Sequence, residues 1–300
     1  FPSELRVLDP DHPSTLARAI PLKIAPHHAV QSPARPNLVA ANEKWARGGV
    51  LLDFVAGEVL TYIDAPRGLR FFGHSAFLPD GKHFLFSACR ENQEGVLLLY
   101  DVETGQLLDQ IPAGGYLTHD IQMDPEGKWV AVANSGSPAD YEGDLTFLEL
   151  STAKKLESFE LGNIAHLCRM NENIWVASGG GGPRKANLQW VDVKTGRTGN
   201  YLDAEGSLGP RIAEVPSLAR LNEELCAATF HESKTVVFWN LKENRCVNFA
   251  FGEKTSGVAL YKGNLYVNLH TSGSLRLFDS VKASLREDSY VLGGGRHLSL

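Results

Sequence analysis

The sequence predicts an all-β fold, a seven-bladed β-propeller in which residues 1–300 form a single domain. Three observations lead to this prediction. Short β-rich runs alternate with turn sequences such as Pro79-Asp-Gly-Lys82. Long amphipathic helical patterns are missing, and the β-rich runs recur at a nearly fixed spacing. A period of roughly 40–45 residues per four-stranded unit is typical of propeller blades.

The repeat is clearest from His74, where a first strand is followed by a turn at 79–82 and strands at 84–88, 95–100 and 107–111. The predicted first strands begin at positions 28, 74, 119, 166, 217, 257 and 297, with intervals of 46, 45, 47, 51, 40 and 40 residues. A polar marker ends each predicted third strand: Asp53, Asp101, Glu149, Asp192, Asn240 and Asp279.

Six repeats are complete, and the seventh is expected to be a composite of both chain ends. His297-Leu-Ser-Leu300 begins a first strand, while Glu4 to Leu8 and Leu16 to Ile24 supply the third and fourth strands. Pairing of N- and C-terminal strands in one blade closes a propeller and removes exposed sheet edges. The sequence offers no strand for the second position of this blade, so six blades is the alternative count.

Composition and charge narrow the function classes. The hydrophobic content of 43% and the charged content of 21% are ordinary for a globular protein. The net charge of −6 argues against non-specific nucleic-acid binding, which needs a basic face. No apolar run reaches the length of a membrane-spanning helix. We therefore expect no nucleic-acid partner and no membrane span.

The four cysteines form no CxxC motif. Cys89 and Cys226 lie in apolar, strand-like runs, where a free cysteine usually behaves as a small hydrophobic residue. The disulfide status of the four residues stays open at this point.

Histidines are concentrated at the first-strand starts. Five of the ten occupy these positions: His28, His74, His119, His166 and His297. Random placement would put about 0.2 histidines at the seven positions, so composition does not explain the pattern. In a propeller, the loop entering the first strand and the loop between the second and third strands open on the same face. His231 and His270 lie in loops of the latter kind, and His27 lies at the same end.

This arrangement predicts a transition-metal site (Cu, Fe or Zn) at one end of the central channel. Neutral imidazole binds all three metals, and crowded imidazoles repel one another when protonated, which favours the neutral form. The favoured ligands are the five first-strand histidines, with His231 and His270 as secondary ligands. Four acidic residues are candidates for oxygen ligands or for acceptors that orient the imidazoles: Asp120, Glu91, Glu232 and Asp140.

Other interpretations remain open. Gly73-His74, followed by Tyr100-Asp101, resembles the Gly-His and Trp-Asp markers of WD40 repeats, in which the histidine has a structural role within its blade. A second interpretation is a protein-interaction scaffold without metal. A third is a metal-dependent enzyme of lactonase-like or redox type, with Glu91 or Asp120 as general base, although GxSxG and HExxH motifs are absent.

Three segments resemble an uncharacterised bacterial propeller family that is described as a domain of unknown function. They are Arg70-Phe-Phe-Gly-His-Ser-Ala-Phe-Leu-Pro-Asp-Gly81, Thr118-His-Asp-Ile121 and Ala165-His-Leu167. The resemblance implies export to the periplasm and a genomic setting with imelysin-type and other iron-uptake proteins. It therefore suggests a role in metal uptake or handling, with periplasmic metal-uptake proteins as partners. The sequence departs from the family pattern at Pro26-His27-His28, where Arg-Gly-His is usual.

Overall fold

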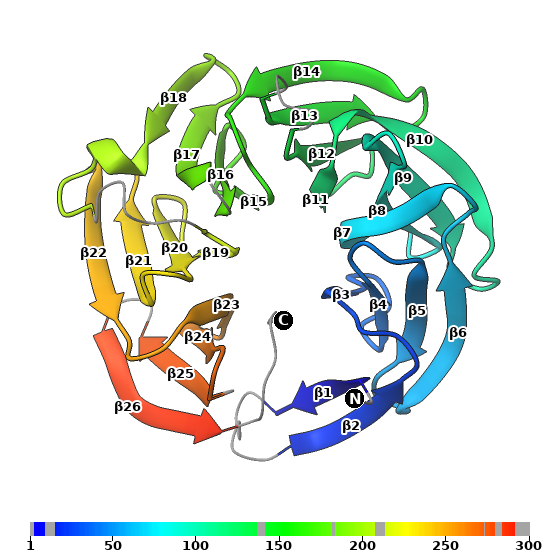
Figure 1. Ribbon diagram of the computed structural model, residues 1–300, viewed down its shortest axis with the longest axis horizontal. Coiled ribbons are helices and arrows are strands. Elements are labelled where there is room, and N and C mark those ends of the chain that lie inside the picture. The colour runs from blue at the N-terminus through cyan, green and yellow to red at the C-terminus, as the bar shows by residue number, and fades with distance from the viewer. Residues whose placement is uncertain are drawn as a thin grey trace. The chain divides into compact units, whose positions relative to one another are not determined.

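The computed structural model describes residues 3–9, 16–136, 142–181, 184–207, 214–272, 274–279 and 284–291. The chain forms two compact units, residues 1–162 and 163–300. The described parts of both units consist of antiparallel sheets whose strands follow chain order (Figure 1). Among the described residues the one helix is the short 3-10 helix η1 (Tyr201–Asp203), and none has the length and apolar character needed to cross a membrane.

The first unit contains three four-stranded blades and a two-stranded sheet. The two-stranded sheet pairs β1 (Ser3–Leu8) with β2 (Leu16–Leu22). The blades are β3 (His28–Gln31), β4 (Leu38–Asn42), β5 (Gly48–Asp53) and β6 (Glu58–Asp64); β7 (Leu69–Phe77), β8 (His83–Arg90), β9 (Glu94–Asp101) and β10 (Leu107–Tyr116); and β11 (Thr118–Met123), β12 (Trp129–Asn134), β13 (Asp144–Glu149) and β14 (Lys154–Glu160).

The second unit contains three more four-stranded blades. They are β15 (His166–Arg169), β16 (Ile174–Gly181), β17 (Arg184–Asp192) and β18 (Arg197–Asn200); β19 (Ser217–Arg220), β20 (Leu225–Phe230), β21 (Thr235–Asn240) and β22 (Arg245–Ala250); and β23 (Thr255–Tyr261), β24 (Asn264–Leu269), β25 (Ser274–Asp279) and β26 (Ser284–Val291).

The described residues therefore form six four-stranded blades, three in each unit, and the prediction of seven blades is wrong. The predicted seventh blade combines N-terminal strands with a first strand that begins at His297. In the structure β1 and β2 pair with each other as a two-stranded sheet, and two strands do not make a four-stranded blade. His297 lies outside the described residues.

The predicted period places the first strands well. β3, β15 and β19 begin at the predicted residues, while β11 begins one residue early and β23 two residues early. β7 begins five residues before the predicted position, at Leu69. This blade therefore has a longer first strand than the repeat alone indicates.

The polar markers at the ends of the third strands form side-chain turns. Asp53 Oδ1 accepts hydrogen bonds from the backbone N–H groups of Val55 and Ala56 at 2.9 and 2.8 Å. Asp101 and Asn240 accept equivalent bonds from the turns that follow them. The bond from Ala56 is the largest of the effects that hold the pKa of Asp53 below its ordinary value. These bonds satisfy turn N–H groups and fix the connection to the fourth strand.

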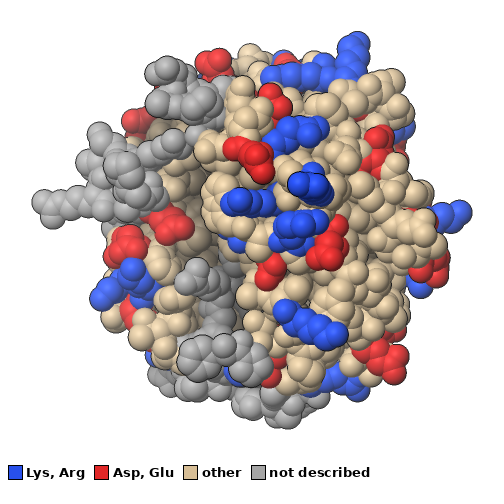
Figure 2. All heavy atoms as spheres, turned by 45° about the vertical axis from the view of Figure 1, so that its right-hand side comes forward, with Lys and Arg blue, Asp and Glu red and all other residues tan. Residues whose placement is uncertain are grey.

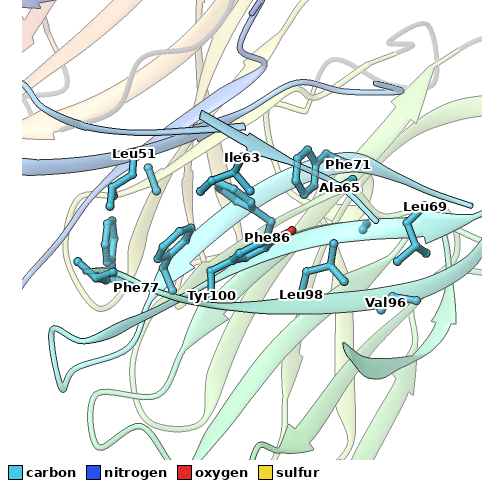
Figure 3. Packing of buried hydrophobic residues seen from close by; sticks show 14 of the residues in the cluster. Leu51, Ile63, Ala65, Leu69, Phe71, Phe77, Phe86, Val96, Leu98 and Tyr100 are labelled. Carbon is cyan, nitrogen blue, oxygen red and sulfur yellow. The ribbon is translucent and has the colours of Figure 1, made fainter. Parts of the chain in front are cut away.

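The hydrophobic core lies between successive blades. In the first unit Leu51 and Ile63 of the first blade pack against the rings of Phe71, Phe86 and Tyr100 of the second (Figure 3). The Phe71 and Phe86 ring centroids are 4.9 Å apart in an edge-to-face arrangement. Full burial of each such side chain contributes about 1.5–3 kcal/mol, so this packing fixes how neighbouring blades meet.

Candidate metal centre

The first strands of the three blades in the first unit are neighbours. β7 contacts β3 on one side and β11 on the other (Figure 1). His28 begins β3, His74 lies within β7 and His119 is the second residue of β11. His27 directly precedes β3, and its backbone N–H donates to Asn42 O at 2.7 Å. The repeat thus brings four histidines from three blades to adjacent strands.

The segments that carry His74 and His119 pair irregularly with their neighbouring strands. The register between β7 and β8 shifts between Phe71 and Ser75, and the register between β11 and β12 shifts between Thr118 and Ile121. A bulge of this kind leaves residues without a ladder partner and changes the direction of their side chains. Bulges are common beside functional sites for this reason.

Gly73 permits a very close approach between β7 and β11. A Cβ atom at this position would lie only 2.0 Å from the backbone oxygen of His119. The carbonyl of Gly73 accepts a 2.8 Å hydrogen bond from Asn42 Nδ2, and the carbonyl of His119 accepts a 3.0 Å bond from Ser87 Oγ. A residue without a side chain is therefore required directly before His74.

The imidazoles form a compact group. His28 stacks on His74 with ring centroids 3.9 Å apart, and the His74 and His119 centroids are 5.0 Å apart. His27 Nε2 lies 3.4 Å from His119 Nε2. Two imidazole nitrogens on one tetrahedral Zn²⁺ are separated by about 3.3 Å, because each Zn–N bond is about 2.05 Å. One ligand nitrogen from each of His27, His74 and His119 lies within 4.8 Å of the others.

Asp120 orients the His74 ring. Its Oδ1 lies 2.8 Å from His74 Nδ1, and both side chains are only 9% exposed. Burial, with a smaller effect from the charge of Lys44, lowers the pKa of His74 to about 3, so the ring is neutral at pH 7. A neutral ring that donates from Nδ1 to a carboxylate keeps a lone pair on Nε2. The same carboxylate–histidine pairing orients ligands in metalloproteins.

The remaining predicted residues are distributed as follows. His28 Nδ1 lies 3.4 Å from Ser75 Oγ, and the His28 ring stacks on the His74 ring. Glu91 lies exposed in the turn between β8 and β9. His166 begins β15 and is buried in the second unit. Asp140 and His297 lie outside the described residues.

His231 and His270 lie together in the second unit. Their ring centroids are 5.3 Å apart in an edge-to-face arrangement. His231 Nδ1 lies 2.8 Å from the carbonyl oxygen of Thr255. The predicted secondary ligands are thus neighbours of each other, within the unit that contains β15 to β26.

His27 and Glu214 are the two residues that the sequence reasoning left out of its ligand set. His27 has a signal, because it directly precedes His28, but it falls outside the first-strand period. Glu214 lies near His231 and Glu232. It belongs to no repeat position or motif, so the sequence gives no signal for it.

Charged side chains of both signs lie on the surface of the molecule. Figure 2 shows basic and acidic side chains interspersed on the face that it presents. Mixed charge of this kind creates little long-range field.

The four-stranded antiparallel sheets and their inter-blade cores define a β-propeller. Solved structures are similar to this chain: the WD40 repeats of RRP9 (TM-score 0.72, covering 93% of this chain and 84% of that one), hydrazine synthase of Kuenenia stuttgartiensis (0.73, 92% and 89%) and U3-55K (0.73, 93% and 85%). Each is 14% identical in sequence, so the likeness shows the fold alone.

The family model described as "Protein of unknown function (DUF1513)" matches residues 20–291, and the chain belongs to this family. No curated protein matches the chain at a significant level.

Proposed function

We propose that this protein binds a transition-metal ion through His27, His74 and His119 and serves in metal uptake or handling in the periplasm. The observation that carries the proposal is the placement of three imidazole nitrogens within 4.8 Å of one another. Asp120 already holds one of the three rings in an orientation suited to metal binding. Three neutral imidazoles suit Cu²⁺ and Zn²⁺ and leave a fourth position for water or an exchanging ligand.

The cluster supports metal binding because its rings are crowded and buried. His74 and His119 are 7% and 2% exposed, and protonated rings at these separations would repel one another. A neutral cluster is the form that binds metal, since ligands must lose their protons first. The role in uptake and the periplasmic location rest on the resemblance to the propeller family associated with imelysin-type proteins, and they are part of the proposal.

Metal titration tests the proposal. Zn²⁺ and Cu²⁺ are added to chelator-treated protein at neutral pH, and binding is followed by calorimetry and by elemental analysis after gel filtration. We expect a His74→Ala/His119→Ala variant to lose one bound ion per chain. Acidification should also release this ion as the imidazoles take up protons.

Two further variants sharpen the test. Asp120→Asn keeps all three ligands and should weaken binding by about 10–100-fold, as is typical when an orienting carboxylate is removed. His83→Ala is the matched control, because His83 Nδ1 is bonded to Asp80 at 2.6 Å in a turn. If the double variant binds as many ions as the His83→Ala protein, the proposed site is wrong.

A further inference from the structure

We infer that the second unit carries a separate, solvent-accessible site for a divalent metal ion, formed by Glu214, His231 and Glu232. One ligand atom from each residue lies within 4.8 Å of the others. Glu214 and Glu232 are exposed and His231 is half-buried. This site differs in ligand chemistry and in accessibility from the buried histidine cluster of the first unit, and it does not depend on that cluster.

The backbone fixes the distance between the two segments that supply the ligands. Glu214 forms an isolated bridge with Gly180 shortly before β19, whereas His231 and Glu232 follow β20. The backbone N–H of His231 donates to the carbonyl of Glu214 at 3.1 Å. This hydrogen bond therefore holds together the two segments that carry the three side chains.

His231 is held in the tautomer that binds metal through Nε2. Its Nδ1 lies 2.8 Å from the carbonyl oxygen of Thr255, and a carbonyl can only accept. Nδ1 must therefore carry the proton, which leaves the lone pair on Nε2. A backbone carbonyl on the other ring nitrogen is a common orienting partner of histidine ligands.

The charges around the site favour a cation. The site has two carboxylates, and the ammonium group of Lys254 lies beside one of them, with Nζ 2.7 Å from Glu232 Oε1. Because a metal ion would bind the same carboxylate, the Lys254 ammonium competes with the ion for Glu232. One imidazole with two carboxylates is a harder ligand set than three imidazoles, and it suits Mn²⁺ or Zn²⁺.

The test removes the first site and titrates the second. In a His74→Ala/His119→Ala background, Mn²⁺ is titrated by electron paramagnetic resonance and Zn²⁺ by calorimetry. We expect Glu214→Gln and His231→Gln to weaken binding of these ions at least tenfold. Lys254→Ala should strengthen it several-fold because the competing ammonium is gone, a result that a purely structural role for these residues does not produce.

Glu253→Gln is the control for loss of a carboxylate elsewhere in the same unit, and Glu253 is half-buried. Glu253 accepts hydrogen bonds from the backbone N–H and the hydroxyl of Ser272, both at 2.6 Å, and this substitution should leave binding unchanged. Absence of both ions from the background protein would overturn the inference, as would undiminished binding in His231→Gln. In a His231→Gln single variant the first cluster is intact. Metal that this variant still binds is therefore assigned to the first cluster, so failure of one site is distinguishable from failure of the other.

Discussion

His74 links the candidate site to the stability of the fold. In the folded chain burial lowers its pKa to about 3, against 6.5 for the exposed residue. Between these values the unfolded chain binds a proton that the folded chain does not. Above pH 6.5 this ring therefore makes the free energy of unfolding of the metal-free protein no lower. As the pH drops from 6.5 toward 3, the free energy of unfolding should fall.

A His74→Gln variant isolates this contribution. The slope contributed by one proton cannot exceed about 1.4 kcal/mol per pH unit. We expect the variant to lose stability less steeply than the wild type between pH 6.5 and the lowest pH at which both remain folded. The measurement is denaturant unfolding across this range. Parallel pH profiles for the two proteins would show that the ring is not held neutral by the fold.

The sequence predicted the positions of individual histidines better than it predicted which of them lie together. His28, His74 and His119 share a repeat position, and the structure places them on adjacent first strands. The period says nothing about loop residues, so it gave no reason to join Glu214 to His231. It also assigned all seven histidines to one site, whereas His231 and His270 pair with each other at 5.3 Å in the second unit.

At the scale of elements, the turn chemistry explains why most strand positions were predictable. Each blade repeats a turn and a polar marker such as Asp101, whose hydrogen bonds fix where the next strand begins. The blade count was not predictable in the same way. It depends on whether further strands join β1 and β2, which pair with each other as expected for neighbouring strands, and no local signal in either strand states this.

A buried polar network holds the β11 segment that carries His119. Thr118 Oγ1 donates to Asn134 Oδ1 at 2.6 Å, and Asn134 Nδ2 donates to Asp144 Oδ1 at 2.9 Å. The three residues lie on β11, β12 and β13 and are at most 4% exposed. The network therefore ties the first strand, with its register shift, to the rest of the blade.

We expect Asn134→Ala to lower the free energy of unfolding by about 1–3 kcal/mol, because it removes hydrogen-bond partners from two buried side chains. It should also weaken metal binding at the histidine cluster, since Thr118 precedes His119. The measurements are denaturant unfolding and Zn²⁺ titration. Asn92→Ala, at an exposed turn, is the control. Equal stability of the two variants would mean that the network does not support the strand.

At the scale of the whole molecule, the reactivity of the cysteines measures the local opening of each unit separately. All four are free and buried: Cys89 in the first unit, and Cys168, Cys226 and Cys246 in the second. Burial raises the pKa of Cys89 to about 11 and that of Cys246 to about 12. Because the thiolate is the reactive form, the folded protein should react slowly with a thiol reagent at pH 8.

We expect four reactive thiols per chain after unfolding, including in protein isolated from an oxidising compartment. A count of two would show a disulfide and contradict the packing seen here. In the folded protein, reaction requires local opening, and a ligand that binds only the folded state suppresses opening. Zn²⁺ at the histidine cluster should therefore slow the labelling of Cys89, and mass spectrometry can locate each modified residue. Loss of this protection in His74→Ala/His119→Ala, but not in His83→Ala, would connect the metal centre to the stability of its own unit.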